Sequence, residues 1–309
     1  MNRQTIATAI PLIAVMLIAG CVGSAGQTTE PQPAEGKGLV ITDFSAVPSD
    51  LRSAMRTAIT LTVENQGDQI AYKTRGLGLL LIPNEWNPDI NNANWKIQGY
   101  GKDLSPADSV TGRPADTQMF KWNAVAPSLP RGQSFTYTIT GRVYYDYTTT
   151  SRGIIPVYPY GEASPQTATF TSSNGPLQIE VQLAPNPPIV ENDSDTFSMN
   201  IIITNVGGGN VYKSGLVGLD SLANSSTFHY DISESDRNVV NLSWARPIGL
   251  HMFDESCLNG VELVGDKAVA LCDVVVEKKP YAVQPYQISI YATYGYYTEK
   301  PISVTVSGK

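Results

Sequence analysis

The sequence predicts an all-β protein made of two tandem sandwiches, and three observations support this fold class. Many short segments alternate apolar and polar residues, which is typical of half-buried strands. Clusters of Gly, Pro, Asn and Asp separate these segments and predict turns. The same order of segments recurs in the second half of the 309 residues. No sustained helical period is present, and only residues 51–55 suggest a helical turn.

The expected strands are rich in β-branched and aromatic residues. They cover residues 57–64, 70–81, 133–147 and 167–171, and then 195–204, 211–219, 269–276, 285–296 and 302–306. Each half also opens with an alternating strand that reaches a proline, LVITDFSAVP from residue 39 and LQIEVQLAPNP from residue 177. Because proline cannot continue a strand ladder, both opening strands are expected to end there.

Three blocks of sequence occur in the same order in both halves. TLTVENQGDQIAYK at 60–73 aligns with NIIITNVGGGNVYK at 200–213, at an offset of 140 residues (200 − 60). The other two matched blocks are MFKWNAVAP with NLSWARP, around Trp122 and Trp244, and the alternating runs Tyr137–Tyr145 and Ile288–Tyr296, at an offset of 151 (288 − 137). This conserved order predicts a duplication.

The duplication divides the chain at TSSNGP, residues 171–176. We expect a first domain over 38–173 and a second over 177–309, each with its own core. Units of about 130 residues with some seven strands suit immunoglobulin-like β-sandwiches.

The chain begins with features of an export signal. Arg3 precedes a run from Thr5 to Gly20 that is almost wholly apolar but too short to span a membrane. The run ends in Ile18-Ala19-Gly20-Cys21, which resembles the lipobox of lipoprotein signal peptides. The resemblance implies that residues 1–20 are removed and that the Cys21 thiol carries a diacylglyceryl group. An ordinary secretory leader and an uncleaved anchor are the alternatives.

Residues 22–37 contain no large apolar side chain and predict a flexible tether. Residues 21–37 would therefore hold the folded part near the membrane through the lipid on Cys21, at the extracellular face of the cytoplasmic membrane.

Composition narrows the classes of partner and chemistry. The formal net charge is −7, which argues against nucleic acid as a partner. The sequence has two His and no Cys-x-x-Cys, so we expect no metal site, and nothing calls for a cofactor. The acidic run at 231–236 has oxygen ligands for Ca²⁺ but does not match a standard loop. No catalytic motif is present, and we expect a protein that is not an enzyme.

Two cysteines remain if Cys21 carries lipid. In an exported chain, Cys257 and Cys272 predict a disulfide. The residues between them alternate on both sides of Val264-Gly265, which predicts a hairpin with the two cysteines on facing strands. Two free buried thiols are the alternative.

Surface features suggest several binding sites. Asn192, Asn224 and Asn241 lie in Asn-x-Ser/Thr sequons and are candidate glycan acceptors. The 83–116 segment, longer than its counterpart in the second half, carries Trp86, Trp95 and Tyr100 among amide and carboxylate side chains. These aromatics either bind a ligand such as a carbohydrate or pack against an open edge of the sandwich.

The paired alternating strands around each Asn-x-Gly turn resemble the CARDB and related immunoglobulin-like domains of archaeal and bacterial cell-surface proteins. RVYYDYTT, after LPRGQSFTYTI, and DLSPADSVTGRPAD are similar to segments of uncharacterised archaeal lipoproteins. The resemblance implies no catalytic residues. We expect a lipid-anchored surface protein with a role in binding, adhesion or envelope structure, whose partners are other surface proteins or glycans. The alternatives are a receptor or transport accessory for a carbohydrate or peptide, and a subunit of a filament or layer.

Overall fold

The computed structural model describes residues 36–88, 95–162, 166–218 and 232–309. In this part of the chain the fold is all-β, as the sequence predicts, with three short 3₁₀ turns, η1 (Lys73–Arg75), η2 (Glu234–Asp236) and η3 (Glu255–Leu258). No helix in the described ranges is long and apolar enough to cross a membrane. Residues Glu35–Lys309 form one compact unit.

Two four-stranded antiparallel sheets have the same internal order. The first contains β1 (Leu39–Val47), β3 (Arg56–Asn65), β7 (Thr117–Val125) and β5 (Asn87–Pro88), in that order. The second contains β10 (Leu177–Ala184), β12 (Thr196–Asn205), β17 (Lys267–Val276) and β15 (Leu250–Met252). This equality of strand order supports the duplication.

The third sheet has ten strands and contains residues of both copies. Its main path is β16 (Val261–Glu262), β14 (Val239–Ala245), β18 (Gln284–Ser307), β8 (Ser134–Pro159), β4 (Gly76–Leu81) and β6 (Trp95–Gly99). Four short strands pair beside this path: β2 (Asp50–Arg52), β9 (Thr169–Ser172), β11 (Ile189–Val190) and β13 (Asn210–Tyr212).

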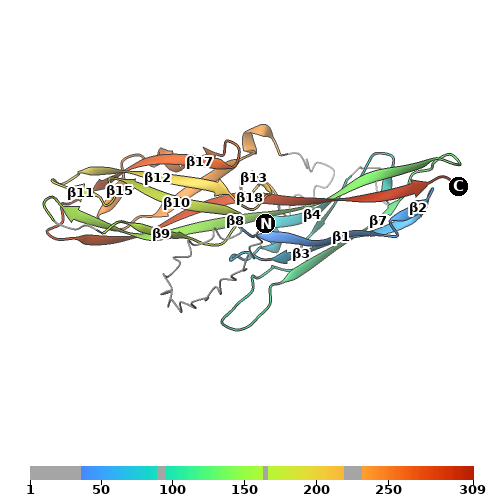
Figure 1. Ribbon diagram of the computed structural model, residues 1–309, viewed down its shortest axis with the longest axis horizontal. Coiled ribbons are helices and arrows are strands. Elements are labelled where there is room, and N and C mark those ends of the chain that lie inside the picture. The colour runs from blue at the N-terminus through green and yellow to red at the C-terminus, as the bar shows by residue number, and fades with distance from the viewer. Residues whose placement is uncertain (1–35, 89–94, 163–165, 219–231) are drawn as a thin grey trace, which may run out of the picture. The chain divides into compact units, whose positions relative to one another are not determined.

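Strands β8 and β18 are the longest, with 26 and 24 residues, and they pair antiparallel along 24 residue pairs. Figure 1 shows the two strands running side by side through both halves of this unit. Residue Tyr145 pairs with Tyr296, its counterpart at the offset of 151 (296 − 145). Since equivalent residues face each other, the pair marks a local twofold axis between the copies.

Each copy therefore contributes half of its last strand to the other copy's sandwich. The first lobe combines the β1-β3-β7-β5 sheet with β4, β6, residues 134–145 of β8 and residues 296–307 of β18. The second lobe combines the β10-β12-β17-β15 sheet with β14, the remainder of β8 and the remainder of β18. The ranges 38–173 and 177–309 thus describe copies along the chain and do not divide it in space.

The expectation of two separate cores is wrong. Buried residues of both lobes form one contiguous apolar cluster, which includes Leu61 and Phe120 from one lobe and Met199 and Ile290 from the other. Phe44 packs so closely on Gly141 that a Cβ there would lie 2.9 Å from its ring. A second cluster, around Leu79, Tyr144 and Tyr212, lies on the outer face of the large sheet.

Several expected boundaries differ from the structure. Residues 51–55, expected as a helical turn, include part of strand β2, which pairs in parallel with β18. The strand expected over 70–81 begins only at Gly76, after η1. The strand expected over 211–219 ends at Tyr212, and residue 219 lies outside the described ranges. The segments 285–296 and 302–306 are one strand, because Glu299-Lys300-Pro301 continues β18.

One of the three repeat blocks was aligned incorrectly. Trp122 lies on β7 and pairs with Ile59, whereas Trp244 lies on β14 and pairs with Ile290 in the other sheet. The counterpart of Ile59 at the offset of 140 is Met199 (59 + 140), and Met199 pairs with Cys272. Cys272, not Trp244, is therefore the structural counterpart of Trp122.

The Asn-x-Gly turn of the first repeat block is confirmed in both copies. Asn65 receives a hydrogen bond on Oδ1 from Gly67 N (3.1 Å) and donates through Nδ2 to Gln69 O (2.8 Å). Asn205 makes the same two contacts, with Gly207 N (3.3 Å) and Gly209 O (2.9 Å). The Asn side chain thus closes each turn by a local hydrogen bond to its own backbone.

Candidate functional site

The aromatic residues of the 83–116 segment mostly pack inside the protein. Trp86 is 3% exposed, and its ring meets Tyr137 edge-on at 5.7 Å. Tyr100 is 5% exposed and donates its hydroxyl to Tyr144 O at 2.7 Å. Trp95 is half-buried on β6 and packs against the outer apolar cluster. The faces of Trp86 and Tyr100 are therefore closed to a ligand, which agrees with the packing alternative.

Two of the three sequons lie in the described part of the chain, whereas the third and the lipidation residue do not. Asn192 and Asn241 are exposed, and Asn241 lies on β14. Asn224 and Cys21 lie outside the described residues. Their use as modification sites stays a prediction.

Cys257 and Cys272 form a disulfide, as the sequence predicts, with their Cα atoms 5.6 Å apart. The expected hairpin is only partly correct. Val264 bridges Lys267 across a turn in which Gly265 has a φ of +66°, but Cys257 lies in η3 and not on a facing strand. Strand β16 leaves β17 and pairs with β14 in the opposite sheet. The disulfide thus ties η3 to β17 at the edge of the core.

The acidic run at 231–236 does not gather into a metal site in the described part of the chain. Its residues Glu234 and Asp236 lie in η2, and residue 231 is outside the described ranges. Among the residues that the structure describes, no group of three or more His, Cys, Asp or Glu side chains is placed to hold a metal ion.

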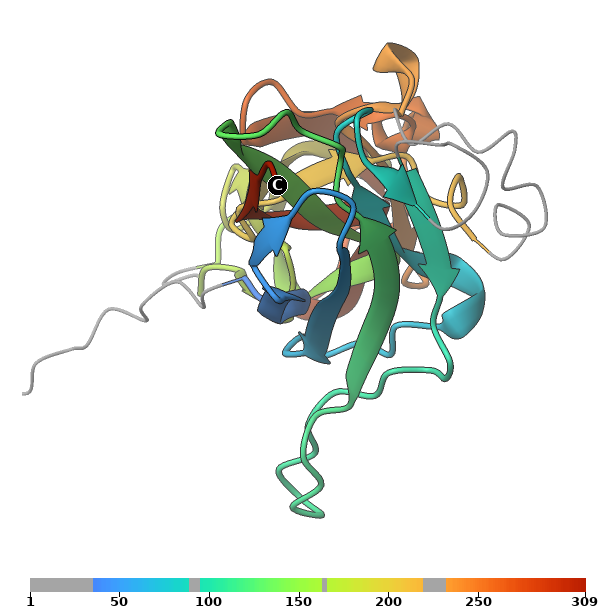
Figure 2. The same ribbon diagram turned by 90° about the vertical axis from the view of Figure 1, so that its right-hand side faces the viewer.

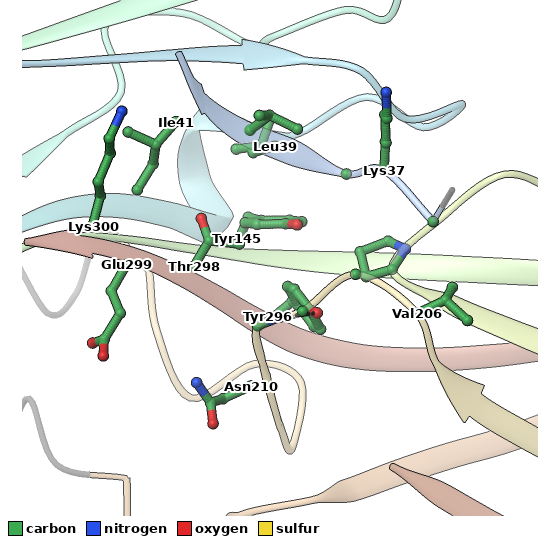
Figure 3. A pocket seen from close by; sticks show the side chains of 17 residues that line it. Lys37, Leu39, Ile41, Tyr145, Val206, Asn210, Tyr296, Thr298, Glu299 and Lys300 are labelled. Carbon is green, nitrogen blue, oxygen red and sulfur yellow. Dashed lines mark hydrogen bonds between the residues drawn. The ribbon is translucent and has the colours of Figure 1, made fainter. Parts of the chain in front are cut away.

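A cavity of about 610 Å³ lies where the two copies meet, next to the local twofold axis. Three segments form its walls: residues 36–41, which lead into β1, the turn 206–210 after β12, and residues 298–300 of β18. Figure 3 shows Leu39 and Ile41 on one side, Thr298 on the other and Tyr145 between them. We call this site the seam cavity. Its volume falls in the range of ligand pockets.

Four tyrosines from the centre of β8 and β18 form the base of this region. Tyr145 and Tyr147 pair with Tyr296 and Tyr294 respectively, and neighbouring ring centroids lie 5.7 to 6.3 Å apart. Burial raises the pKa of the Tyr296 hydroxyl to about 12. That hydroxyl accepts from Gly209 N at 2.7 Å and donates to Asn205 Oδ1 at 2.9 Å, so it fixes the Asn-x-Gly turn beside the cavity.

Two hydroxyl groups in the lining have no hydrogen-bond partner among the described residues. They are Tyr145 Oη and Thr298 Oγ1, and both atoms are buried. Tyr145 itself is 1% exposed. Buried polar groups are nearly always hydrogen-bonded, and an unsatisfied one costs about 1–3 kcal/mol. Both hydroxyls belong to residues of the cavity lining.

The charged groups of the lining are arranged around the rim. Glu299 is held by Arg142, with Nη2 at 2.7 Å and Nε at 2.9 Å from its carboxylate. Arg142 also lies over the ring of Tyr297, with its Cζ atom 4.4 Å from the ring centroid. Figure 3 shows Glu299 pointing away from the space between β1 and β18, and Lys300 toward the opposite side. The interior of the cavity is therefore lined mainly by aliphatic, aromatic and hydroxyl groups and by backbone.

Sequence reasoning missed the seam cavity. Its lining comes from five separate stretches of chain, and the pairing of β8 with β18 brings them together. The equal offset of Tyr145 and Tyr296 was visible in the sequence, but it did not say that the two residues face each other.

Comparisons with known proteins give no family. No family model matches the chain, and no curated protein matches it. Among solved structures, native alpha-2-macroglobulin of E. coli aligns over 90% of this chain at 10% identity with a TM-score of 0.21. The collagen-binding domain of the Erysipelothrix rhusiopathiae surface protein RspB aligns over 89% of this chain and 95% of its own length, at 10% identity and a TM-score of 0.14. The chain spans 17% of the macroglobulin, and TM-scores this low carry no argument about fold or function.

Proposed function

We propose that this chain is a lipid-anchored cell-surface protein with a non-enzymatic binding role, and that the seam cavity is its binding site. The observation that carries the binding role is the cavity of about 610 Å³, whose lining includes Tyr145 and Thr298. The lining offers donors, acceptors and ring faces, which suit recognition of a ligand. The immunoglobulin-like assignment of the sandwiches and the resemblance to CARDB-containing archaeal lipoproteins belong to this proposal.

The anchor rests on the sequence before residue 22. The lipobox-like Ile18-Ala19-Gly20-Cys21 would place a diacylglyceryl group on Cys21, and residues 22–37 would separate the folded unit from the membrane. The unit from Glu35 onward is one compact body, so a single tether would carry both lobes together.

Mass spectrometry of the membrane-extracted protein tests the anchor. We expect a mature N-terminus at Cys21 with a mass increase for the lipid, and release of the Cys21→Ser variant into the soluble fraction. Ser24→Ala, a change in the same tether, is the matched control and should stay in the membrane. An unmodified Cys21 in the parent, together with equal retention of both variants, would contradict the anchor.

A further inference from the structure

The second copy shows what fills the position that corresponds to the seam cavity. Strand β9 pairs antiparallel with residues 151–154 of β8, and the chain then follows β8 to the start of β10. Ser173 N donates to Thr150 O at 2.7 Å, and the Tyr147 hydroxyl donates to Asn174 O at 2.7 Å. An extended piece of polypeptide thus closes the gap between the two sheets of the second lobe.

The local twofold axis between the copies relates the position of this closing segment to an equivalent position in the first lobe. The offset of 151 maps Tyr147 of β8 onto Thr298 of β18 (147 + 151) and maps residues 151–154 onto 302–305. Strands β1 and β10 correspond as well, since Leu39 pairs with Asn65 and Leu177 with Asn205. Thr298 therefore occupies the place of the tyrosine whose hydroxyl holds the closing segment.

No equivalent of β9 is present on the first lobe within the described residues. There β18 pairs with β13 through Tyr297 and with β2 from Thr305, and its outer edge between them has no strand partner. The same stretch, residues 298–300, lines the seam cavity opposite residues 36–41. The open edge, the cavity and the unpartnered Thr298 hydroxyl thus coincide.

The residues of this chain that correspond to β9 in the first copy have a low propensity to form a strand. Relative to β1, β9 maps at an offset of 138 (177 − 39) onto residues 31–34, which read PQPA. Pro31 and Pro33 have no N–H group to donate, whereas β9 reads TFTS. This sequence matches β9 poorly, which favours a closing segment that comes from another chain.

We infer that the seam cavity accepts an extended peptide segment of a partner protein, which pairs with the open edge of β18 and closes the first lobe as β9 and residues 173–176 close the second. This inference rests on the proposed binding role at the same cavity. Addition of a strand to an exposed edge is a known mode of peptide recognition, in which the backbone supplies most of the hydrogen bonds.

The edge of β18 limits which peptides fit. Thr305 N donates to Ser49 O, the residue before β2, so the backbone groups of alternate residues 301 and 303 also face outward. Pro301 offers only its carbonyl there. It occupies the place of Thr150 (150 + 151), whose N–H donates to the Ser173 hydroxyl oxygen in the second lobe. The bound segment is therefore anchored by donors to the carbonyls of β18 and by an acceptor for Thr298 Oγ1. Proline and charged side chains also protect this edge from indiscriminate pairing.

A synthetic peptide copying residues 167–176, TATFTSSNGP, is the probe, because it is the segment that closes the second lobe. It is added to the full chain in detergent, and amide hydrogen exchange is followed. We expect protection at residues 39–41 and 299–303 at a stoichiometry of one, and the same protection in the Cys21→Ser protein, which separates this test from that of the anchor.

Two hydroxyl variants test the contacts with the peptide, and a third is the matched control. Thr298→Val and Tyr145→Phe should each weaken peptide binding about 3- to 15-fold, the loss expected for one hydrogen bond. Both should leave the melting temperature unchanged or raised, because each removes an unpartnered buried hydroxyl. Ser151→Ala also removes an unpartnered buried hydroxyl, on the part of β8 in the second lobe, and should not change the affinity.

Three results would overturn the inference. The first is a peptide that leaves residues 39–41 and 299–303 unprotected. The second is equal affinity in the parent and in Thr298→Val. The third is a seam that is already protected in the free chain and loses that protection when residues 22–35 are deleted, since the chain's own tether would then be the occupant. If a glycan protects residues 39–41 and 299–303 from amide exchange and the peptide does not, the proposed binding role is kept and the inference of a peptide ligand is rejected.

Discussion

At the scale of single residues, the hydrogen-bonding side chains divide into those that sequence reasoning finds and those that it does not. The Asn65 and Asn205 turns were predictable, because the side chain bonds to its own backbone two to four residues away. The hydroxyls of Tyr145 and Thr298 were not, because 153 residues (298 − 145) separate them and their meeting depends on the full register of β8 with β18. The sequence shows that both residues carry hydroxyl groups, but it does not show that they line the same cavity.

Asp146 is a partly buried acid that sequence reasoning did not single out. It lies on β8, accepts a hydrogen bond from Gly215 N at 3.1 Å and approaches Arg75 Nη1 at 3.4 Å. Burial raises its pKa from 3.8 to about 6, despite the opposing effects of Gly215 and Arg75. Because the folded pKa is above the unfolded one, folding is favoured by protonation, and that stabilisation is lost as the pH rises through about 6.

We expect Asp146→Asn to raise the free energy of unfolding at pH 7.5 by about 1–2 kcal/mol. A pKa shift of roughly two units sets an upper bound near 3 kcal/mol on this gain, and the loss of the ion pair with Arg75 offsets part of the gain. The amide oxygen can still accept from Gly215 N. At pH 4 the gain should vanish. Urea unfolding of the parent, Asp146→Asn and the exposed control Asp43→Asn at both pH values checks this. A gain that is equal at the two pH values would contradict the assignment.

At the scale of elements, the short alternating strands were predictable and the two long ones were not. The pattern of β12, in which Phe197, Met199 and Ile201 are buried in alternation, gave its position to within a residue or two. Strand β8 continues twelve residues beyond Tyr147 (159 − 147), through TTTSRG, because its polar residues there are enclosed by the second lobe. Glu299-Lys300-Pro301 suggests a turn, yet it continues β18 because the outer edge at this point has no strand partner among the described residues.

The disulfide element gives a prediction about local stability. Cys272 is 1% exposed on β17, and Cys257 lies in η3, which has little regular pairing of its own. The bond spans 15 residues, for which chain entropy corresponds to about 3 kcal/mol. We expect reduction to remove exchange protection first from residues 255–263, while β1 and β3 keep theirs until global unfolding.

Hydrogen exchange of the oxidised and reduced protein measures this, with the Cys257→Ala/Cys272→Ala double variant as a reference that cannot reform the bond. Loss of protection that begins in β1 and β3, or at an equal rate throughout, would show that the disulfide does not act locally.

At the scale of the whole folded unit, duplication was predictable but independence of the copies was wrong. The copies were expected to have separate cores because each has enough strands for a sandwich. Figure 2 shows the compact unit from the side that lies at the right in Figure 1. A single apolar cluster extends through both lobes. Register between strands far apart in sequence is set by tertiary packing, so an alignment of the copies could not reveal that their last strands cross.

The central claim is that β8 and β18 join the two copies into one cooperative body. Leu61 and Ile201 are equivalent residues (61 + 140), both 0% exposed, on β3 of one lobe and β12 of the other. Leu61→Ala and Ile201→Ala should each cost about 2–5 kcal/mol. Differential scanning calorimetry of the parent and both variants is the direct test. The account predicts one transition, with equal calorimetric and van't Hoff enthalpies, that either variant shifts as a whole. Two transitions, each lowered only by the variant in its own lobe, would contradict it.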